Sequence, residues 1–282
     1  MNIIEAILLG IIQGLTEFLP ISSTAHLTIA GKLLHLISAE NPERWTAFIA
    51  VIQLGTMLAV VIYFWKDLVN IVAGFFKENL LHRRNFSEQT IGSRIGWYII
   101  IGTLPIVVIG LMFKDTIEGV LTKNLWIISL SLVALAVLLA ISEKVSKHLK
   151  DIQKIKWYDA LIIGIGQALA LIPGSSRSGT TITAGLFMGL NRETAARFSF
   201  LLSVPAVLAS GLLELKESLP YINFSESINL IIATLVAGIS GYLAIDFLLK
   251  YLRKNTTFVF VYYRIILGAG IIILLYINLL NP

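Results

Sequence analysis

The chain has 282 residues, of which 56% are hydrophobic and only 14% are charged, with a formal net charge of +5. About a quarter of the residues in a soluble domain are charged, so this composition predicts a membrane protein. The chain contains no cysteine, which excludes disulfides, thiolate chemistry and cysteine-ligated metal sites. The N-terminus has no basic segment before its apolar run, so we expect no cleavable signal peptide.

Six apolar stretches are long enough to cross a bilayer, which takes about 20 helical residues. They lie near 45–64, 94–113, 124–142, 194–213, 227–249 and 259–279. Two further apolar stretches, 3–36 and 158–190, are each interrupted by a proline and small polar residues. Proline ends one helix before another begins, so we predict that each is a re-entrant hairpin of two half-helices. Two kinked full-length spans are the alternative.

The residues before the two interruptions match closely. AILLGIIQGL at 6–15 corresponds to ALIIGIGQAL at 160–169, and Gln13 aligns with Gln167 at an offset of 154 positions. A chance match in apolar sequence is the alternative, but the aligned glutamines and the proline followed by a serine pair in both strings argue against it.

The order of the segments predicts an all-α polytopic membrane protein with an inverted-topology repeat. A hairpin returns to its own side, so one re-entrant hairpin plus three transmembrane helices ends on the opposite side. The second half then repeats the unit upside down, and both hairpin tips meet near mid-membrane, as in secondary transporters. We expect a single membrane domain, 1–282, with a first repeat at 1–142 and a second at 158–282.

The basic residues are distributed unequally between the two predicted sides. Fifteen lie on one side: Lys66, Lys77, Arg83, Arg84, Arg94, Lys144, Lys147, Lys150, Lys154, Lys156, Arg192, Arg197, Lys250, Arg253 and Lys254. Five lie on the other: Lys32, Arg44, Lys114, Lys123 and Lys216. The positive-inside rule makes the first side cytoplasmic and places both termini outside. Topology and attraction to membrane lipids account for the basic charge, so no nucleic-acid partner is needed.

The first interrupting string, QGLTEFLPISSTAH, runs from Gln13 to His26. Gln13 and Glu17 are four residues apart and share one face of a half-helix. Ser22 and Ser23 follow the proline, where capping is an alternative to a functional role. A carboxylate among apolar neighbours is costly unless it is paired or hydrated, so Glu17 is a candidate functional group. His26 is a candidate general acid or base, with a satisfied core histidine as the alternative.

The second interrupting string is PGSSRSGTT at 173–181. Arg177 is predicted at the start of a half-helix, where free N–H groups and the helix dipole already favour an anion. Its guanidinium matches phosphate oxygens, and a structural ion pair with Glu17 is a compatible alternative. Neighbours that add donors or permit close approach are Gly174, Ser176, Ser178, Gly179 and Thr181. The nucleotide-binding pattern GxxxxGK[ST] is absent.

An anion-binding tip between membrane helices suits a substrate with a phosphate head and a membrane-soluble tail. Attack on phosphorus needs charge neutralisation, a positioned nucleophile and a group that protonates the leaving oxygen. Arg177, Ser23 and His26 can supply these functions. We expect Glu17 and His26, from one tip, to lie within reach of Arg177 from the other.

The two motifs together, QxxxEFLPISSTxH at 13–26 and PGxSRSGxT at 173–181, resemble the undecaprenyl-diphosphate phosphatase family, also called bacitracin resistance proteins. The resemblance covers essentially the whole chain. It implies an integral membrane phosphatase of the bacterial inner membrane that hydrolyses undecaprenyl diphosphate to undecaprenyl phosphate and inorganic phosphate. This recycles the lipid carrier of peptidoglycan and cell-wall synthesis and confers bacitracin resistance.

The resemblance carries family roles onto matching positions of this chain. The catalytic set is Glu17, Ser23, His26 and Arg177, and the substrate-binding set is Gln13, Ser22, Thr24, Gly174, Ser176, Ser178 and Thr181. Ser23, His26 and an activated water stay open as the nucleophile. Because the family's first carboxylate position is here Gln13, a metal site with two carboxylates is in doubt. Mg²⁺ or another divalent cation at Glu17 stays open, and no cofactor is certain.

A transporter or flippase of the phosphorylated polyprenyl carrier is the rival hypothesis, because it would use the same fold and the same phosphate site. The sequence leaves a homodimer as an open alternative. Arg264 lies inside the last apolar span, and Asp246 in the preceding span is its expected partner.

Overall fold

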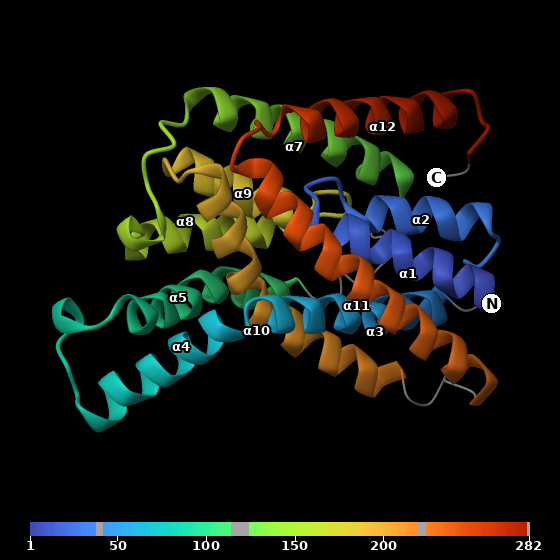
Figure 1. Ribbon diagram of the computed structural model, residues 1–282. Helices are drawn as coiled ribbons and strands as arrows, with labels where there is room; N and C mark the ends of the chain where they lie inside the picture. The colour runs from blue at the N-terminus through green and yellow to red at the C-terminus, as the bar shows by residue number, and fades with distance from the viewer. Residues whose placement is uncertain (38–41, 114–123, 219–223, 281–282) are drawn as a thin grey trace.

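The computed structural model describes residues 1–37, 42–113, 124–218 and 224–280 (Figure 1). Over these residues the fold is all-helical, with no strand beyond one isolated bridge. Six helices are long and apolar enough to cross a membrane, and the apolar span within each agrees with a predicted span to within three residues at either end. They are α3 (Pro42–Tyr63), α5 (Ile91–Met112), α7 (Leu125–Val145), α10 (Arg192–Ser218), α11 (Phe224–Leu252) and α12 (Phe258–Tyr276). The chain is therefore a multi-pass membrane protein.

Each interrupted stretch forms two short helices that lie against each other and run in opposite directions (Figure 1). The first stretch contains α1 (Ile3–Phe18) and α2 (Ser23–Leu33). The second contains α8 (Trp157–Ala168), a short 3₁₀ turn (Leu169–Leu171) and α9 (Arg177–Phe187). The positions where α2 and α9 begin and end differ by the same 154 residues as the aligned glutamines.

The break in each stretch is made by a serine that caps the following helix. Ser22 has φ 76° and its hydroxyl accepts from Ala25 N at 3.3 Å, while Ser176 has φ 67° and accepts from Gly179 N at 3.2 Å. A left-handed serine is uncommon outside special sites, and here both serines also satisfy a free N–H of the next helix. The capping serine thus has the same backbone conformation in both tips, whereas Gly174, with φ 86°, corresponds to Pro20 in the first tip.

The far ends of α2 and α9 also correspond. His35 and Gly189, again 154 positions apart, have φ 55° and 81°. After each, the chain closes the helix with the same bond, from Leu36 N to Gly31 O at 2.8 Å and from Leu190 N to Gly185 O at 3.0 Å. A left-handed residue with this bond is a common helix ending that satisfies otherwise free carbonyls.

Close glycine contacts cross between the two halves of the chain. A Cβ on Gly10 of α1 would lie 2.5 Å from the carbonyl oxygen of Ala233 in α11. A Cβ on Gly164 of α8, at the equivalent position, would lie 2.3 Å from that of Gly102 in α5. Helices in lipid gain little from hydrophobic exclusion and associate by close packing, which small residues allow. The first helix of each interrupted stretch is therefore packed against a long helix of the other half.

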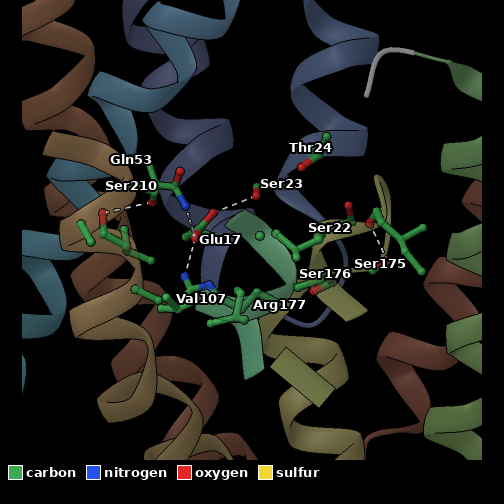
Figure 2. Close-up of a pocket in the computed structure, with 18 of the residues that line it drawn as sticks. Glu17, Ser22, Ser23, Thr24, Gln53, Val107, Ser175, Ser176, Arg177 and Ser210 are labelled. Carbon is green, nitrogen blue, oxygen red and sulfur yellow. Dashed lines mark hydrogen bonds and ion pairs between the residues drawn. The ribbon is translucent and has the colours of Figure 1, made fainter. Parts of the chain in front are cut away.

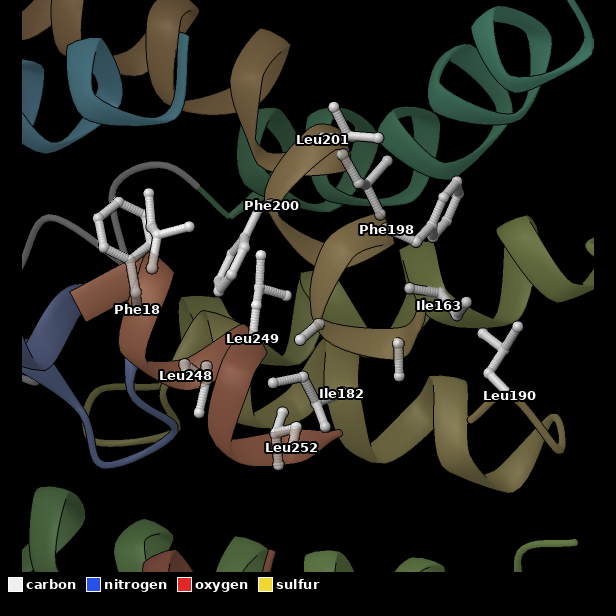
Figure 3. Packing of buried hydrophobic residues seen from close by; sticks show 14 of the residues in the cluster. Phe18, Ile163, Ile182, Leu190, Phe198, Phe200, Leu201, Leu248, Leu249 and Leu252 are labelled. Atoms are coloured by element: carbon white, nitrogen blue, oxygen red, sulfur yellow. The ribbon is translucent and has the colours of Figure 1, made fainter. Parts of the chain in front are cut away.

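A large buried cluster lies beside the tips and draws on both halves (Figure 3). Phe18, the last residue of α1, contacts Phe200 of α10 edge-to-face at 5.3 Å between ring centroids. Ile182 of α9 and Leu248 of α11 belong to the same cluster and are fully buried. Close packing of this kind resists small displacements, so it holds the end of α1 in place relative to α9 and α10.

Among the described residues, α4 (Trp65–Phe76) is an α-helix that the sequence did not predict. It has 12 residues and an apolar face on which Trp65, Val72 and Phe76 are exposed. It was missed because it is too short to span a membrane and continues directly from α3, whose apolar sequence it extends. Its exposed apolar face next to the basic connection before α5 is typical of a helix lying in the membrane interface.

The connections α4–α5 and α7–α8 lie at one end of the molecule, and the two chain termini lie at the other (Figure 1). The connections at the first end carry many of the basic residues, and several are paired there. The pairs are Arg197 with Asp67, Arg192 with Glu143, Lys150 with Asp159 and Arg253 with Glu193. Of the five predicted basic residues on the opposite side, Lys114 and Lys123 lie outside the described residues, as does the side chain of Arg44.

The expected pair between Arg264 and Asp246 is wrong. Asp246 accepts from Lys250 Nζ at 2.7 Å and from the hydroxyl of Tyr63 at 3.2 Å. Arg264 is instead fully buried and donates to backbone carbonyl oxygens. Asp246 is one turn before Lys250, and this local pair satisfies it without a partner from another span.

Candidate active site

A cavity of about 460 Å³ lies between the two tips and the helices α5 and α10 (Figure 2). Its polar end is formed by the tips, and its apolar walls by the two long helices. The polar lining residues include Glu17, Ser22, Ser23, Thr24, Gln53, Ser175, Ser176 and Arg177. The wall includes Ile106, Val107, Gly110, Leu111, Ala206, Val207 and Leu213. The cavity therefore suits an amphiphilic ligand, with a charged head at its polar end and an apolar tail along its apolar walls.

Glu17 is at the centre of the polar end and accepts from four donors (Figure 2). Its Oε1 accepts from Arg177 Nη2 at 2.5 Å and from Gln53 Nε2 at 3.2 Å. Its Oε2 accepts from Ser23 Oγ at 2.8 Å and from Gln13 Nε2 at 3.1 Å. A carboxylate surrounded by donors alone is held as the anion, and its burial is offset by the charge of Arg177. The prediction that Glu17 lies within reach of Arg177 is confirmed.

Arg177 is the first residue of α9, and 15% of its side chain is exposed, at the cavity. The bond to Glu17 uses Nη2 alone, so other N–H groups of the guanidinium can reach a second anion in the cavity. The N-terminus of α9 adds its positive dipole end at the same place. This combination of fixed charge and free donors is suited to a phosphate group.

Ser23 and Thr24 begin α2 and face the cavity from the other tip. The hydroxyl of Ser23 donates to Glu17, which leaves its oxygen lone pairs available toward the cavity. A hydroxyl bonded to a buried carboxylate at the edge of a cavity is the geometry of an activated nucleophile with an adjacent base. Ser22 and Ser176 line the cavity as well, but their hydroxyls accept from backbone N–H groups and shape the tips.

His26 makes its polar contacts away from Glu17 and Arg177. Its Nδ1 is 2.7 Å from Ser22 O, and its Nε2 is 2.6 Å from the hydroxyl of Tyr263, whose ring is stacked on the imidazole. A carbonyl oxygen only accepts, so Nδ1 donates, and in the neutral ring Nε2 then accepts from Tyr263. His26 therefore braces the tip that carries Ser23.

The remaining predicted binding residues divide into lining and supporting groups. Gly174, with φ 86°, lines the cavity. Gln13 lies behind Glu17 and is buried. Ser178 donates to Leu19 O of the other tip at 3.2 Å, and Thr181 is fully buried against Ser199, with 2.6 Å between hydroxyls. Ser178 and Thr181 thus support the tips from within.

Two functional residues were not found from the sequence. Gln53 of α3 donates to Glu17, and Tyr263 of α12 bonds to His26. Gln53 could have been identified as a polar side chain within an apolar span, which is a signal for a buried partner. Tyr263 carried no such signal, because tyrosine is common near the ends of membrane helices.

The site is poorly suited to a metal ion held by protein ligands alone. Among the described residues, no group of three or more histidine, aspartate or glutamate side chains could hold one. Both oxygens of Glu17 already accept from two donors each, so a divalent ion would have to replace some of them. A divalent cation at this site would depend on ligands that a bound substrate supplies.

A family profile described as "Bacitracin resistance protein BacA" matches residues 6–270. The chain belongs to the BacA family. Its similar relatives include an undecaprenyl-diphosphatase of Syntrophobacter fumaroxidans, 58% identical over 96% of this chain and 97% of the relative. Two others with the same name are from Chloroherpeton thalassium (50% identical, 98% of this chain, 97% of the relative) and Chlorobium phaeovibrioides (49%, 100% of each chain). This BacA-family chain thus matches its relatives over nearly their whole length.

Proposed function

We propose that this protein is an undecaprenyl-diphosphatase, which hydrolyses undecaprenyl diphosphate to undecaprenyl phosphate and inorganic phosphate. The single observation that carries the proposal is the Arg177–Glu17–Ser23 group at the polar end of a cavity with apolar walls. Relatives at 49–58% identity bear that name. The enzyme would recycle the lipid carrier for cell-wall synthesis, and an abundant enzyme would confer bacitracin resistance.

In the first step, Ser23 Oγ attacks the terminal phosphorus of the diphosphate. Arg177 and the N-terminal N–H groups of α9 hold the phosphoryl oxygens and neutralise their charge. The Oγ–P bond forms, the bridging P–O bond breaks, and the Ser23 proton passes to Glu17 Oε2, its hydrogen-bond partner at 2.8 Å. Undecaprenyl phosphate leaves with the bridging oxygen.

In the second step, water attacks the phosphoserine. The Oγ–P bond breaks, Glu17 returns its proton to Oγ, and inorganic phosphate leaves as H₂PO₄⁻. The same carboxylate thus acts first as a base and then as an acid, which the cycle requires by microscopic reversibility. Direct attack by water, with Ser23 as a donor to the phosphate, remains the competing route.

His26 has two proposed roles. The predicted one is proton transfer to the leaving group. The contacts with Ser22 and Tyr263 support a second, in which the imidazole fixes the tip that presents Ser23. His26→Asn, which keeps a side-chain donor, separates the two: a positioning role predicts substantial activity, and a proton-transfer role predicts its loss.

If turnover requires Mg²⁺, we propose that Glu17 would be the residue of this chain that holds it. A divalent ion so placed would neutralise phosphate charge beside Arg177. Because Gln13 stands where a second carboxylate would be needed, the ion would keep several waters. Titration of activity with a chelator and then with Mg²⁺ tests this requirement directly.

We also propose the inverted-topology repeat, with re-entrant hairpins at 3–36 and 158–190 within a single domain of repeats 1–142 and 158–282. The shared offset of 154, the matching capping serines and the reciprocal glycine contacts support it.

We place the protein in the bacterial inner membrane with both termini outside, as the basic connections indicate. Single cysteines added near Asn2 and at Lys147, tested with impermeant thiol reagents, check that orientation, and the chain has no native cysteine to interfere. A homodimer is a further proposal, tested by the mass of the protein in detergent or lipid nanodiscs.

The deciding experiment for function is phosphate release from a polyprenyl diphosphate by purified protein in detergent micelles. Transport has no meaning in micelles, so release there establishes the enzyme. A protein that binds the substrate but releases no phosphate would instead favour the transporter or flippase. The relatives' shared name favours the enzyme.

A further inference from the structure

Arg264 of α12 is a fully buried cation that does not line the cavity. It donates from Nη2 to Ser175 O at 2.9 Å and from Nε to Leu132 O at 3.2 Å. Longer contacts of 3.5 Å join it to Gly174 O and to Pro20 O. One guanidinium thus contacts both tips and α7.

No carboxylate pairs with Arg264 among the residues that the structure describes; its partners are carbonyl oxygens. A buried charge is costly unless it is compensated, and carbonyl dipoles compensate it only in part. A neutral donor could tie carbonyls together without this cost. Arg264 therefore leaves a net positive charge next to Gly174 and Ser175, which line the cavity.

The tip residues are arranged around this side chain. A Cβ on Gly179 would lie 2.6 Å from Arg264 Nη1, so the absence of a side chain at position 179 makes room for the guanidinium. The carbonyls that it holds are two and three residues before Arg177, and Pro20 is three residues before Ser23. The relative position of Arg177 and Ser23 is thus tied to one cation.

We propose that Arg264 is a positioning residue that holds the two tips in register and adds a second, uncompensated positive charge to the anion site. It acts through the backbone of both tips and does not touch the substrate. The proposal deepens the proposed phosphatase function and rests on it for the identity of the anion as a diphosphate.

The test compares Arg264→Gln with Arg264→Lys in purified protein, measuring kcat, KM and the inhibition constant of inorganic pyrophosphate. Gln removes the charge, so we expect about a 10-fold weaker pyrophosphate inhibition and about a 30-fold lower kcat. Lys keeps the charge but not the planar fork, so we expect inhibition within about 3-fold of wild type while kcat stays about 10-fold lower. A merely structural residue would not separate the two constants in this way.

A second variant covers the case in which Arg264→Gln does not fold. Gly179→Ala keeps Arg264 but crowds it, and we expect kcat to fall about 5-fold or more. Gly270→Ala, on α12 where a Cβ meets open space, and Arg253→Gln, in an exposed pair with Glu193, are the matched controls and should have wild-type kcat.

Three outcomes would overturn the proposal: wild-type kinetics in a folded Arg264→Gln protein, equal pyrophosphate inhibition in the Gln and Lys variants, or wild-type kcat in Gly179→Ala. A failure of the proposed function would look different, because the unaltered protein would then release no phosphate. In that case the variants are compared by how much pyrophosphate raises their melting temperature. An equal rise in all of them would reject the role of the Arg264 charge in anion binding.

Discussion

The two tips share a capping serine of the same conformation and differ in the side chains that they present. Ser22 and Ser176 adopt the same left-handed conformation and cap the helices that follow them. One residue later, at equivalent positions, stand Ser23 in the first tip and Arg177 in the second. The position of Glu17 corresponds to Leu171. The first tip thus carries the carboxylate and the hydroxyl, and the second carries the cation.

The comparison indicates that the loop before each capped helix directs the N-terminus of that helix toward an anion. The side chain of the first helical residue, Ser23 or Arg177, then determines which chemical group the tip contributes. Both tips direct the start of a helix at one cavity, so both contribute free N–H groups and dipole ends. An attacking group and a phosphate clamp on the same tip would compete for the same place. In the proposed mechanism, their division between two tips places the phosphorus between them.

Removal of the attacking group should have the largest effect. We expect Ser23→Ala to lower kcat by about 10³-fold or more with a small change in KM, because the hydroxyl acts on the reacting phosphorus. Phosphate release in micelles measures it. Ser129→Ala is the control, since the hydroxyl of this buried serine donates to Trp126 O of its own helix. Activity within a few-fold of wild type in Ser23→Ala would transfer the role to His26 or water.

Replacement of Arg177, the equivalent residue of the second tip, by another cation should lower activity less than the loss of Ser23. Arg177→Lys retains the cation but loses the fork that bonds Glu17 and phosphate together, and we expect about a 10²-fold loss in kcat/KM. Arg197→Lys, which changes a pair with Asp67 remote from the tips, is the matched control. Wild-type kcat/KM in Arg177→Lys would show that a single positive charge at this position is sufficient for catalysis. The planar fork of arginine would then have no role.

A change in the apolar wall of the cavity should affect binding of the polyprenyl tail of the substrate more than binding of its diphosphate head. A Cβ on Gly110 of α5 meets open space in the cavity, so Gly110→Leu should narrow the path of a long polyprenyl chain. We expect KM to rise about 10-fold for a long-chain diphosphate and less for a short one. Gly270→Leu is the control. An equal effect on both substrates would place the tail elsewhere.

The capping serines should give the smallest and most symmetrical effects. Ser22→Ala and Ser176→Ala lose a cap and force alanine into a left-handed backbone, at a cost of about 1–3 kcal/mol each. Ser22→Gly and Ser176→Gly should recover part of this stability, since glycine adopts that backbone freely. Thermal unfolding in detergent measures both pairs. Very different losses at the two tips would contradict a shared frame.

Sequence alone was sufficient for the spans, the two breaks and the proximity of Glu17 to Arg177. These follow from apolar length, from proline and serine punctuation and from the cost of unpaired charges in a membrane. α4 was missed because a 12-residue helix continuous with a span carries no length signal. The partners of Arg264 could not be predicted, because they are backbone carbonyl oxygens far away in the chain. Every residue has a carbonyl, so the amino-acid sequence does not indicate which ones bind Arg264. Gln53 carried a usable signal, a polar side chain within an apolar span, whereas Tyr263 was missed because its role depends on packing between helices far apart in the chain.

The most direct test of the central claim is to map the phosphoryl group during turnover. Protein mixed with a polyprenyl diphosphate labelled on its terminal phosphate is quenched on the millisecond-to-second scale, and its phosphopeptides are sequenced. A hydroxyl from one tip attacking a phosphate held by the other predicts label on Ser23, and only trace labelling when Arg177 is replaced by Ala. Label on His26, or phosphate release with no labelled residue at any time, would contradict the account.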